Sequence, residues 1–523
     1  MNTQGIRSPV NQGHQVQEGL VKLHGPCEDG MCDAIRDPSN RSPYPLSSLD
    51  HNPLGMNVSF LLFFQTTQPG ESIRVLEDGI KLLLKVHPFL AGDVTRRSEF
   101  SQRKYTWQIE PEAPESLVQF PMLQTRHSQV ESIRELHSKC LLTGAEEQEI
   151  MSRLAPLPID MDLSLPRRPI LRFQANVMRD GIILAMTFHH AAMDGAGAAR
   201  VLGLLADCCR DPRAMSSANA PPDRQLRSEI ERLVSESSSG SSRADFSQHY
   251  CGLGDWAALL AENWSGFLRA RATELVTWRV TIPGSKIQYL KGACNALLRG
   301  QASARADGRP NPGFLSNNDI VCALMGMILR QAGQLAGKST ELSLAVDMRG
   351  NFQTPAFDDY LGNMVLLTYT PIPARRNEAP VDGADPPVEL SQECLEELTQ
   401  IAARIRQSLL AVDADYIQGA LSHLQSQTDW AEIGFRGVPI PLSSFRNFGI
   451  FGLDFGESLG AQPRGFQLHL PVLGGMCFIL PKRQDGLAST EPWDLHLTLN
   501  RDDQNLVAKD PLFCWATGGQ PWE

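Results

Sequence analysis

The sequence lacks any apolar run long enough to cross a membrane. Its longest apolar runs, such as VSFLLFF and CALMGMIL, fall far short of the roughly 20 residues that a spanning helix needs. The first residues, MNTQGIRSPVNQGHQVQEG, also lack the basic start and the apolar stretch of a secretory signal. We therefore expect a cytoplasmic protein without a membrane span.

The sequence also lacks an excess of positive charge. Its 48 Lys and Arg against 59 Asp and Glu give a formal net charge of −11. A negative protein has no general electrostatic attraction to nucleic acid or to an anionic membrane. We expect small molecules as partners, no nucleic acid, and a monomer.

Paired cysteines at metal-binding spacing are absent as well. The 11 cysteines are scattered and odd in number, which suits a reducing compartment better than a disulfide framework. Cys27 with Cys32, and Cys208 with Cys209, stand close together, but no second pair follows at the spacing of a zinc finger. We expect no bound metal.

The length of the chain favours two domains, because 523 residues exceed what one hydrophobic core usually serves. Residues 1–40 are polar and rich in turn formers, which predicts a mobile tail. An N-terminal domain is expected over 41–210. Residues 211–272 contain stretches rich in Ser, Pro and Gly and a short charged helix, which predicts an exposed crossover linker. A C-terminal domain is expected over 273–523.

Hydrophobic periodicity predicts strands and helices in both halves. In the first half, VSFLLFFQ (58–65) is typical of a buried strand, and a helical pattern follows until Pro88. A hairpin is expected over 171–188, with a turn at Asp180 and Gly181. In the second half, alternation predicts a strand over 276–282. Both halves are therefore of the α/β class.

The stretch MTFHHAAMDGAG (186–197) is the strongest functional candidate. His189 and His190 follow a buried strand, and Asp194 and Gly195 precede a helical pattern. A histidine at the exit of a buried strand is rigidly held and suited to act as a general base. The alternative is a polar strand end followed by an ordinary helix-entry turn. A metal site made by the two histidines and Asp194 is weaker, since adjacent strand residues point to opposite faces.

These residues resemble the motifs of a known family. HHAAMDG (189–195) is similar to the HxxxDG signature of BAHD-type acyl-CoA-dependent acyltransferases, within the superfamily of chloramphenicol acetyltransferase and peptide-synthetase condensation domains. DFGES (454–458) partly matches the family's DFGWG signature. Five further stretches also resemble family landmarks: YPLSSLD, HPFLAGDV, LSNNDIVCAL, AVDMRG and YLGNMV. The long tail and wide linker look like the fungal branch that acylates secondary metabolites.

The resemblance implies two chloramphenicol acetyltransferase-like domains, each a mixed sheet with flanking helices, and an active-site channel between them. It also implies roles for individual residues, and it implies that Asp194 pairs with Arg349 and so ties the histidine segment to the second domain. The expected catalytic residues are His190 and Asp194; the structural ones are Gly195, Arg349, Asp454 and Gly456; the cofactor-binding ones are Ser316, Asn318 and Asp319. Ser316 also fits a helix N-cap, with Asp319 completing a capping box.

The DFGES segment departs from the family, because Glu457 and Ser458 stand where relatives usually have Trp and Gly. Contact of this segment with the cofactor is therefore in doubt, and a turn with no role in binding is the alternative.

The expected reaction is O-acyl transfer from acyl-CoA, most simply acetyl-CoA, to a hydroxyl of a small hydrophobic secondary metabolite. Acyl-CoA would be a co-substrate, and no cofactor would be bound permanently. A thioester is already activated, so the demands are to remove the acceptor proton and to stabilise an oxyanion. Two alternatives stay open: a free-standing condensation-type enzyme that uses a carrier-protein-bound acyl group, and a non-catalytic ligand-binding descendant.

Overall fold

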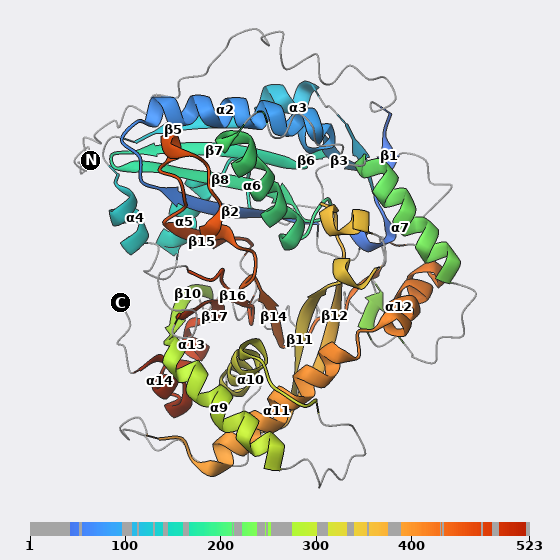
Figure 1. Cartoon of the computed structure of the whole chain (residues 1–523), viewed down its shortest axis with the longest axis vertical. Coiled ribbons are helices and arrows are strands. Elements are labelled where there is room, and N and C mark those ends of the chain that lie inside the picture. Colours follow the sequence, from blue (N-terminus) through green and yellow to red (C-terminus); the bar gives the residue numbers. More distant parts are fainter. Residues whose placement is uncertain are drawn as a thin grey trace, which may run out of the picture.

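Two large mixed sheets with helices packed against them dominate the fold (Figure 1). The computed structural model describes residues 42–51, 55–96, 107–111, 114–128, 131–139, 145–159, 167–211, 213, 222–237, 246, 249–252, 275–300, 312–331, 339–352, 355–374, 389–428, 430, 433–471, 474–483 and 491–518. The predicted tail, 1–40, lies outside these residues. None of the helices in the described ranges is long and apolar enough to cross a membrane.

The first sheet carries the histidine pair and has the strand order β15-β2-β8-β7-β5. Only β5 and β7 run parallel; the other neighbours are antiparallel. All residues of β2, β7 and β8 are buried, as their apolar runs predict. The strands are β15 (Gly465–His469), β2 (Asn57–Phe64), β8 (Gly181–His189), β7 (Leu171–Met178) and β5 (Leu123–His127).

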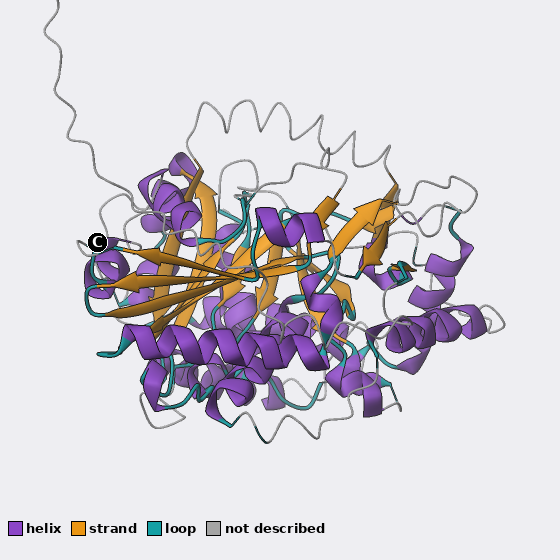
Figure 2. Ribbon diagram, turned by 90° about the horizontal axis from the view of Figure 1, so that it is seen from above, coloured by secondary structure: helices purple, strands orange, loops and turns teal. Residues whose placement is uncertain are grey.

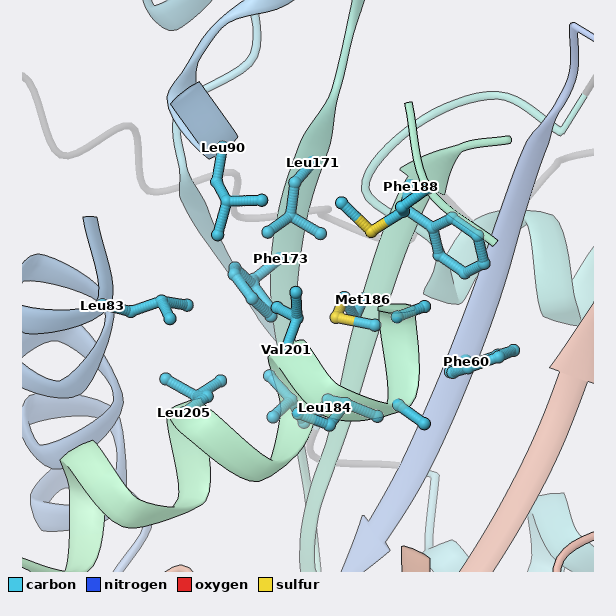
Figure 3. Close-up of a cluster of buried hydrophobic side chains, with 14 of the residues drawn as sticks. Phe60, Leu83, Leu90, Leu171, Phe173, Leu184, Met186, Phe188, Val201 and Leu205 are labelled. Atoms are coloured by element: carbon cyan, nitrogen blue, oxygen red, sulfur yellow. The ribbon is translucent and has the colours of Figure 1, made fainter. Parts of the chain in front are cut away.

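Helices α2 (Pro69–Val86) and α6 (Gly195–Arg210) pack side by side over one face of this sheet. Figure 3 shows the core between them, where Leu83 of α2 and Leu205 of α6 face strand residues such as Phe173. The opposite face is covered by α4 (Ile133–Lys139) and α5 (Ala145–Leu154). This packing on both faces fixes the end of β8, from which the candidate site is built.

The second sheet has the order β10-β17-β16-β14-β11-β12, with β14 parallel to both of its neighbours. Its strands are β10 (Leu275–Ile282), β17 (Trp493–Asn500), β16 (Cys477–Ile479), β14 (Ile440–Ser444), β11 (Thr340–Asp347) and β12 (Val365–Ile372). Its core is formed with α9 (Gly284–Gly300), α10 (Asn317–Leu329), α11 (Gln392–Leu410), α13 (Arg501–Ala508) and α14 (Pro511–Thr517). Figure 2 shows that the longest helices gather on one side of the strands.

Two small sheets, three further α-helices and several short 3₁₀ helices complete the described structure. The small sheets pair β1 (Tyr44–Pro45), β4 (Trp107–Glu110), β3 (Asp93–Arg96) and β6 (Arg167–Pro169), and β13 (Ile433–Phe435) with β9 (Tyr250–Gly252). The helices are α3 (Pro114–Gln119), α7 (Asp223–Ser237) and α12 (Ala414–Ser426). Helices α7 and α12 pack against each other beside the end of the second sheet.

The predicted crossover linker contains a helix that belongs to the core. The expected exposure of 211–272 is wrong for α7, whose Leu226, Ile230 and Val234 are buried against apolar side chains of α12. Arg227 of the same helix is only 2% exposed. The charged face of α7 masked this role in the sequence, because a charged helix is usually a solvated one.

A second feature that the sequence did not reveal is the strand β15. It comes from the second half of the chain and pairs with β2 of the first half, from Gly465 opposite Phe63 to His469 opposite Ser59. The first sheet is therefore completed by residues that lie about 400 positions further along the chain.

Candidate active site

The histidine pair lies at the end of β8, where the first sheet meets the second half. The backbone N–H of His189 donates to the carbonyl of Ile170 at 2.9 Å, and that of His190 donates to Met56 at 2.8 Å. Both histidines are thus tied to neighbouring parts of the first sheet. The predicted hairpin and the predicted position of the pair at the strand end are confirmed.

His189 is a buried residue with a local structural contact. Its side chain is 3% exposed, and its Nδ1 accepts a hydrogen bond from the N–H of Ala191 at 3.3 Å. Burial, with a further effect from the nearby Arg168, lowers the pKa of His189 to about 3. An imidazole in this environment stays neutral and packs as a core side chain.

His190 differs from its neighbour because its side chain is only half-buried. Its Nδ1 is shielded from solvent, and no atom of the described residues lies in hydrogen-bond geometry with it. Burial lowers the pKa of His190 from its ordinary 6.5, while its own carbonyl, the Asp194 carboxylate and the Asn363 amide partly oppose this effect. The ring of Phe188 lies 6.4 Å away, centroid to centroid. His190 therefore offers a neutral imidazole at neutral pH.

Asp194 caps helix α6 and joins it to the second half. Its Oδ1 accepts from the N–H of Gly197 at 2.8 Å, as expected of an N-cap. Arg349 donates from Nη2 to both carboxylate oxygens, at 3.0 and 3.1 Å, and the N–H of Met364 donates to Oδ2 at 2.9 Å. Asp194 is 2% exposed and faces these partners. The predicted pair of Asp194 with Arg349 is confirmed as a contact.

The glycines after Asp194 allow two segments to approach closely. A Cβ at Gly197 would lie 2.0 Å from the carbonyl oxygen of Leu361, so a side chain there would push the second half away. A Cβ at Gly195 would lie 3.2 Å from the ring of Phe445. Glycine is therefore required at 197 for contact with the second half, whereas a side chain at 195 would require the Phe445 ring to shift by a few tenths of an ångström.

Asn363, in the YLGNMV landmark, makes a contact that the sequence did not predict. Its Nδ2 donates to the carbonyl of His190 at 2.9 Å. Asn363 precedes β12, and Arg349 follows β11. These two paired strands therefore bring both residues to the loop between β8 and α6 (190–194), the His190 loop. Its place in a family landmark was the one signal in the sequence.

The DFGES segment lies against the first sheet, away from the histidines. Phe455 packs edge to face on Phe64, with 5.0 Å between ring centroids. Asp454 accepts from the N–H of Gly456 at 2.9 Å, and Gly456 has a φ of +84° that favours glycine. The carbonyl of Ser458 accepts from the Thr66 hydroxyl at 2.9 Å. These contacts are those of a structural turn.

The three residues expected to bind cofactor lie at the start of α10. Ser316 and Asp319 form the predicted capping box, and Asp319 also accepts from Arg406 at 2.7 Å. Asn318 accepts from the Ser444 hydroxyl at 2.9 Å. Ser444 directly precedes Phe445, which borders Gly195, so the start of α10 and the His190 loop approach the same junction between the halves.

A polar surface cavity of about 990 Å³ lies elsewhere, beside the turn between β7 and β8. Its lining includes Arg179, Asp180, Glu457 and Ser458. Strand β8 separates this turn from His189 by about 26 Å, at roughly 3.3 Å per residue. The cavity is therefore no part of the candidate active site. Within the described parts of the chain, no three or more His, Cys, Asp and Glu side chains are grouped to hold a metal ion.

Comparisons with known proteins identify the family of the chain. The family description "Trichothecene 3-O-acetyltransferase-like N-terminal domain" matches residues 57–209. O-acetyltransferase pyr7 of Aspergillus fumigatus is 74% identical over 518 residues, which cover 99% of each chain. The chain belongs to the fungal O-acetyltransferase family. Fumigaclavine B O-acetyltransferase ifgI of Penicillium roqueforti is 31% identical to this O-acetyltransferase, over 90% of the chain and 97% of the relative.

A solved structure shares the fold of this O-acetyltransferase. F. sporotrichioides TRI101, complexed with coenzyme A and T-2, superposes with a TM-score of 0.66 at 19% identity, over 90% of this chain and 97% of that one. The expected chloramphenicol acetyltransferase-like fold is confirmed, as is the expected O-acetyltransferase family. The condensation-type and non-catalytic alternatives are not favoured.

Proposed function

We propose that this O-acetyltransferase moves an acetyl group from acetyl-CoA to a hydroxyl of a polycyclic secondary metabolite, with His190 as the general base. One observation carries the assignment of the base. Of the two adjacent histidines, His190 is partly exposed while His189 is buried, and burial keeps the pKa of His190 below the ordinary value. A neutral imidazole can accept a proton, whereas an imidazolium cannot.

The reaction follows from these properties as a single displacement. His190 takes the proton of the acceptor hydroxyl while the hydroxyl oxygen attacks the thioester carbonyl, which forms a tetrahedral intermediate. The intermediate collapses, the carbon–sulfur bond breaks, and the CoA thiolate takes up the proton held by His190. The ester and free CoA are the products, and no acyl-enzyme is needed.

Asp194 supports this reaction without contacting the acceptor. Its carboxylate is occupied by Gly197, Arg349 and Met364. It therefore acts by fixing the loop that carries His190 and by favouring the imidazolium formed during the reaction. Gly195 and Arg349 serve the same loop, while Asp454 and Gly456 shape a turn in the core.

An apolar acceptor fits the aromatic side chains that border the His190 loop. Phe445 and Phe448 stack at 4.8 Å between ring centroids, are partly exposed, and lie beside Gly195. Ring faces of this kind bind flat apolar molecules. The name of a relative, fumigaclavine B O-acetyltransferase, points to the hydroxyl of a secondary metabolite as the acceptor.

We propose that the start of α10 borders the part of the active site that binds acetyl-CoA. The side chains of Ser316 and Asp319 are engaged in the capping box. Direct contact with the co-substrate would therefore fall mainly to Asn318, aided by the positive end of the helix.

The division of the chain into domains at 41–210 and 273–523 is likewise proposed. In this division, β15 is a strand of the second half that completes the sheet of the first.

We also propose that the enzyme works in the cytoplasm. Seven cysteines are free thiols, in keeping with a reducing compartment: Cys208, Cys209, Cys294, Cys322, Cys394, Cys477 and Cys514.

The test is to incubate the protein with acetyl-CoA and a panel of polycyclic alcohols that includes fumigaclavine B. Thiol release and product mass are followed together. We expect release of one CoA thiol for each acetyl ester formed, and loss of both signals in His190→Ala. Binding of free acetyl-CoA without any ester, in a panel that contains the native acceptor, would argue against the proposal.

A further inference from the structure

Asp50 joins three distant segments beneath the His190 loop. Its side chain is completely buried, within the YPLSSLD stretch. Its Oδ2 accepts from the N–H and hydroxyl of Ser47, at 2.7 and 2.6 Å, and from Nη1 of Arg227. Its Oδ1 accepts from the N–H and Nδ2 of Asn363, at 3.1 and 2.9 Å. One carboxylate thus holds an arginine of α7 and an asparagine of the second half.

Both of these partners also bind the loop that carries His190. Arg227 donates from Nη2 to the carbonyl of Ala192 at 2.9 Å. Asn363 donates from Nδ2 to the carbonyl of His190 at 2.9 Å. Two of the loop's carbonyls therefore receive their hydrogen bonds from side chains that Asp50 holds.

Arg227 is fixed in place by more than Asp50. Its Nε donates to Asp223 at 2.7 Å, and Asp223 in turn accepts from the hydroxyl of Tyr44 at 2.7 Å. The guanidinium lies 5.6 Å from the ring centre of Tyr360. An arginine with this many fixed partners presents its Nη2 in one direction, which a flexible surface arginine does not.

The loop has little support of its own at these two positions. Inside it, the N–H of Ala192 donates to the carbonyl of His189 at 2.9 Å. Among the described residues, the side chains of Asn363 and Arg227 donate to the carbonyls of His190 and Ala192. A buried carbonyl without a donor is costly, so removal of either side chain would make the loop shift toward other partners.

We propose that Asp50, acting through Arg227 and Asn363, is a positioning residue that sets the orientation of the His190 imidazole for proton transfer. The proposal rests on the assignment of His190 as the base. It gives α7, a helix of the crossover segment, a direct part in the active site. Because small displacements of a catalytic group are costly, loss of the contact should reduce turnover about tenfold to a hundredfold.

The experiment uses substitutions of Arg227 in the full-length enzyme. Arg227→Met removes all of its hydrogen bonds, and Arg227→Lys keeps the charge but cannot reach Asp50, Asp223 and Ala192 together. Arg232→Met is the matched control, because Arg232 lies on the same helix, is exposed, and pairs with Glu229 and Glu236 of that helix. Turnover and the KM for acetyl-CoA are measured at a temperature at which near-ultraviolet circular dichroism shows each variant folded.

We expect Arg227→Met to lower kcat about tenfold or more with the KM for acetyl-CoA within about twofold, and Arg227→Lys to recover part of the loss. Arg232→Met should behave as wild type. The proposal is overturned if Arg227→Met and Arg227→Lys have the same kcat as the control after correction for the folded fraction. If Arg227→Met does not fold, Arg227→Lys and Asp50→Asn decide by the same criterion.

A second readout separates this proposal from the assignment of the base. Proton–carbon correlation spectra of enzyme labelled with ¹³C-histidine, with the His190 signal assigned by its loss in His190→Ala, report the environment of the imidazole without any substrate. The proposal requires the His190 signal, and the pH at which it titrates, to move in Arg227→Lys and Asp50→Asn but not in Arg232→Met. Unmoved signals would overturn it. Turnover that persists in His190→Ala would instead reject the base.

Discussion

Arg349 and Asp194 form a buried ion pair although 155 residues separate them in the sequence. Nη2 of the arginine lies 3.0 and 3.1 Å from the two carboxylate oxygens. The same guanidinium donates to the carbonyls of Tyr360 and Gly362, at 2.9 and 2.6 Å. The pair thereby holds α6, the helix that follows the histidines, against residues 360–362, which precede β12.

Breaking this pair should lower stability as well as activity. Removal of one partner leaves a buried charge uncompensated, so we expect Arg349→Ala to reduce the free energy of unfolding by about 3–5 kcal/mol. Asp194→Asn should cost less, because an amide oxygen can still cap α6. Urea denaturation measures both. Lys81→Ala is the control, since its pair with Asp78 is exposed and worth about 0–1 kcal/mol. Arg349→Ala with the stability of the control would contradict this reading.

The two adjacent histidines should respond differently to the same substitution. His190→Ala should lose about 100-fold or more in turnover while it keeps the fold and acetyl-CoA binding. His189→Ala should lose mainly stability, because His189 is buried and packs in the core. Equal losses of turnover in the two folded variants would count against His190 as the base.

The pH dependence of turnover gives an independent test of His190. Burial lowers its pKa below the ordinary 6.5. Because only the neutral imidazole accepts a proton, kcat/KM should rise with pH in the acid range, with its midpoint below the ordinary pKa of 6.5, and level off toward neutral pH. A profile measured with saturating acetyl-CoA that still climbs steeply from pH 7 to 8 would show that another group controls the rate.

Three buried histidines should make the fold sensitive to acid. Burial lowers the pKa of His189 and His496 to about 3 and that of His469 to about 4. Below the ordinary value of 6.5, the unfolded chain binds protons that the folded chain does not. Their contribution to stability is therefore complete above about pH 6.5 and is lost as the pH falls toward 4, by up to about 1.4 kcal/mol per pH unit for each histidine. Urea denaturation between pH 7 and 4.5 should show a shallower decline in His469→Gln. A slope identical to that of wild type would disprove the contribution of His469.

The DFGES segment should matter for stability and not for acetyl-CoA binding. Phe455 is fully buried in the core of the first sheet, so Phe455→Ala should reduce the free energy of unfolding by about 3–5 kcal/mol. Glu457→Ala, at an exposed neighbouring position, should be close to neutral. The KM for acetyl-CoA should be unchanged in both. A rise in KM in folded Phe455→Ala would restore a role for this segment in binding the co-substrate.

Features specified by nearby residues could be predicted from the sequence. The strand β2, the hairpin of β7 and β8, helix α6 and the capping box of Ser316 with Asp319 all follow from periodicity, turn residues or capping chemistry. The pair of Asp194 with Arg349 was reached through the resemblance of their motifs to a known family. Periodicity alone carries no information about which distant arginine meets a given aspartate.

Features that depend on distant packing could not be predicted. GFQLH is too short and too mixed in polarity to reveal that β15 joins β2. The buried state of Arg227 was hidden because its helix is rich in charge, and its partner Asp50 lies far away in the sequence. In both cases the stabilising contacts form only when the chain has already brought remote segments together.

The position of β15 has a consequence for how this gene can be divided. A fragment that ends after α6 would lose β15, and β2 would become the edge of its sheet with open backbone groups along a strand whose eight residues are buried in the whole enzyme. Such an edge recruits other chains, so the fragment would self-associate into aggregates, whereas the complementary piece supplied in trans could cap it. The boundary between the halves that the sequence suggests is therefore not a point at which the enzyme can simply be cut. A chimera with a relative should take β15 from the same protein as the first half.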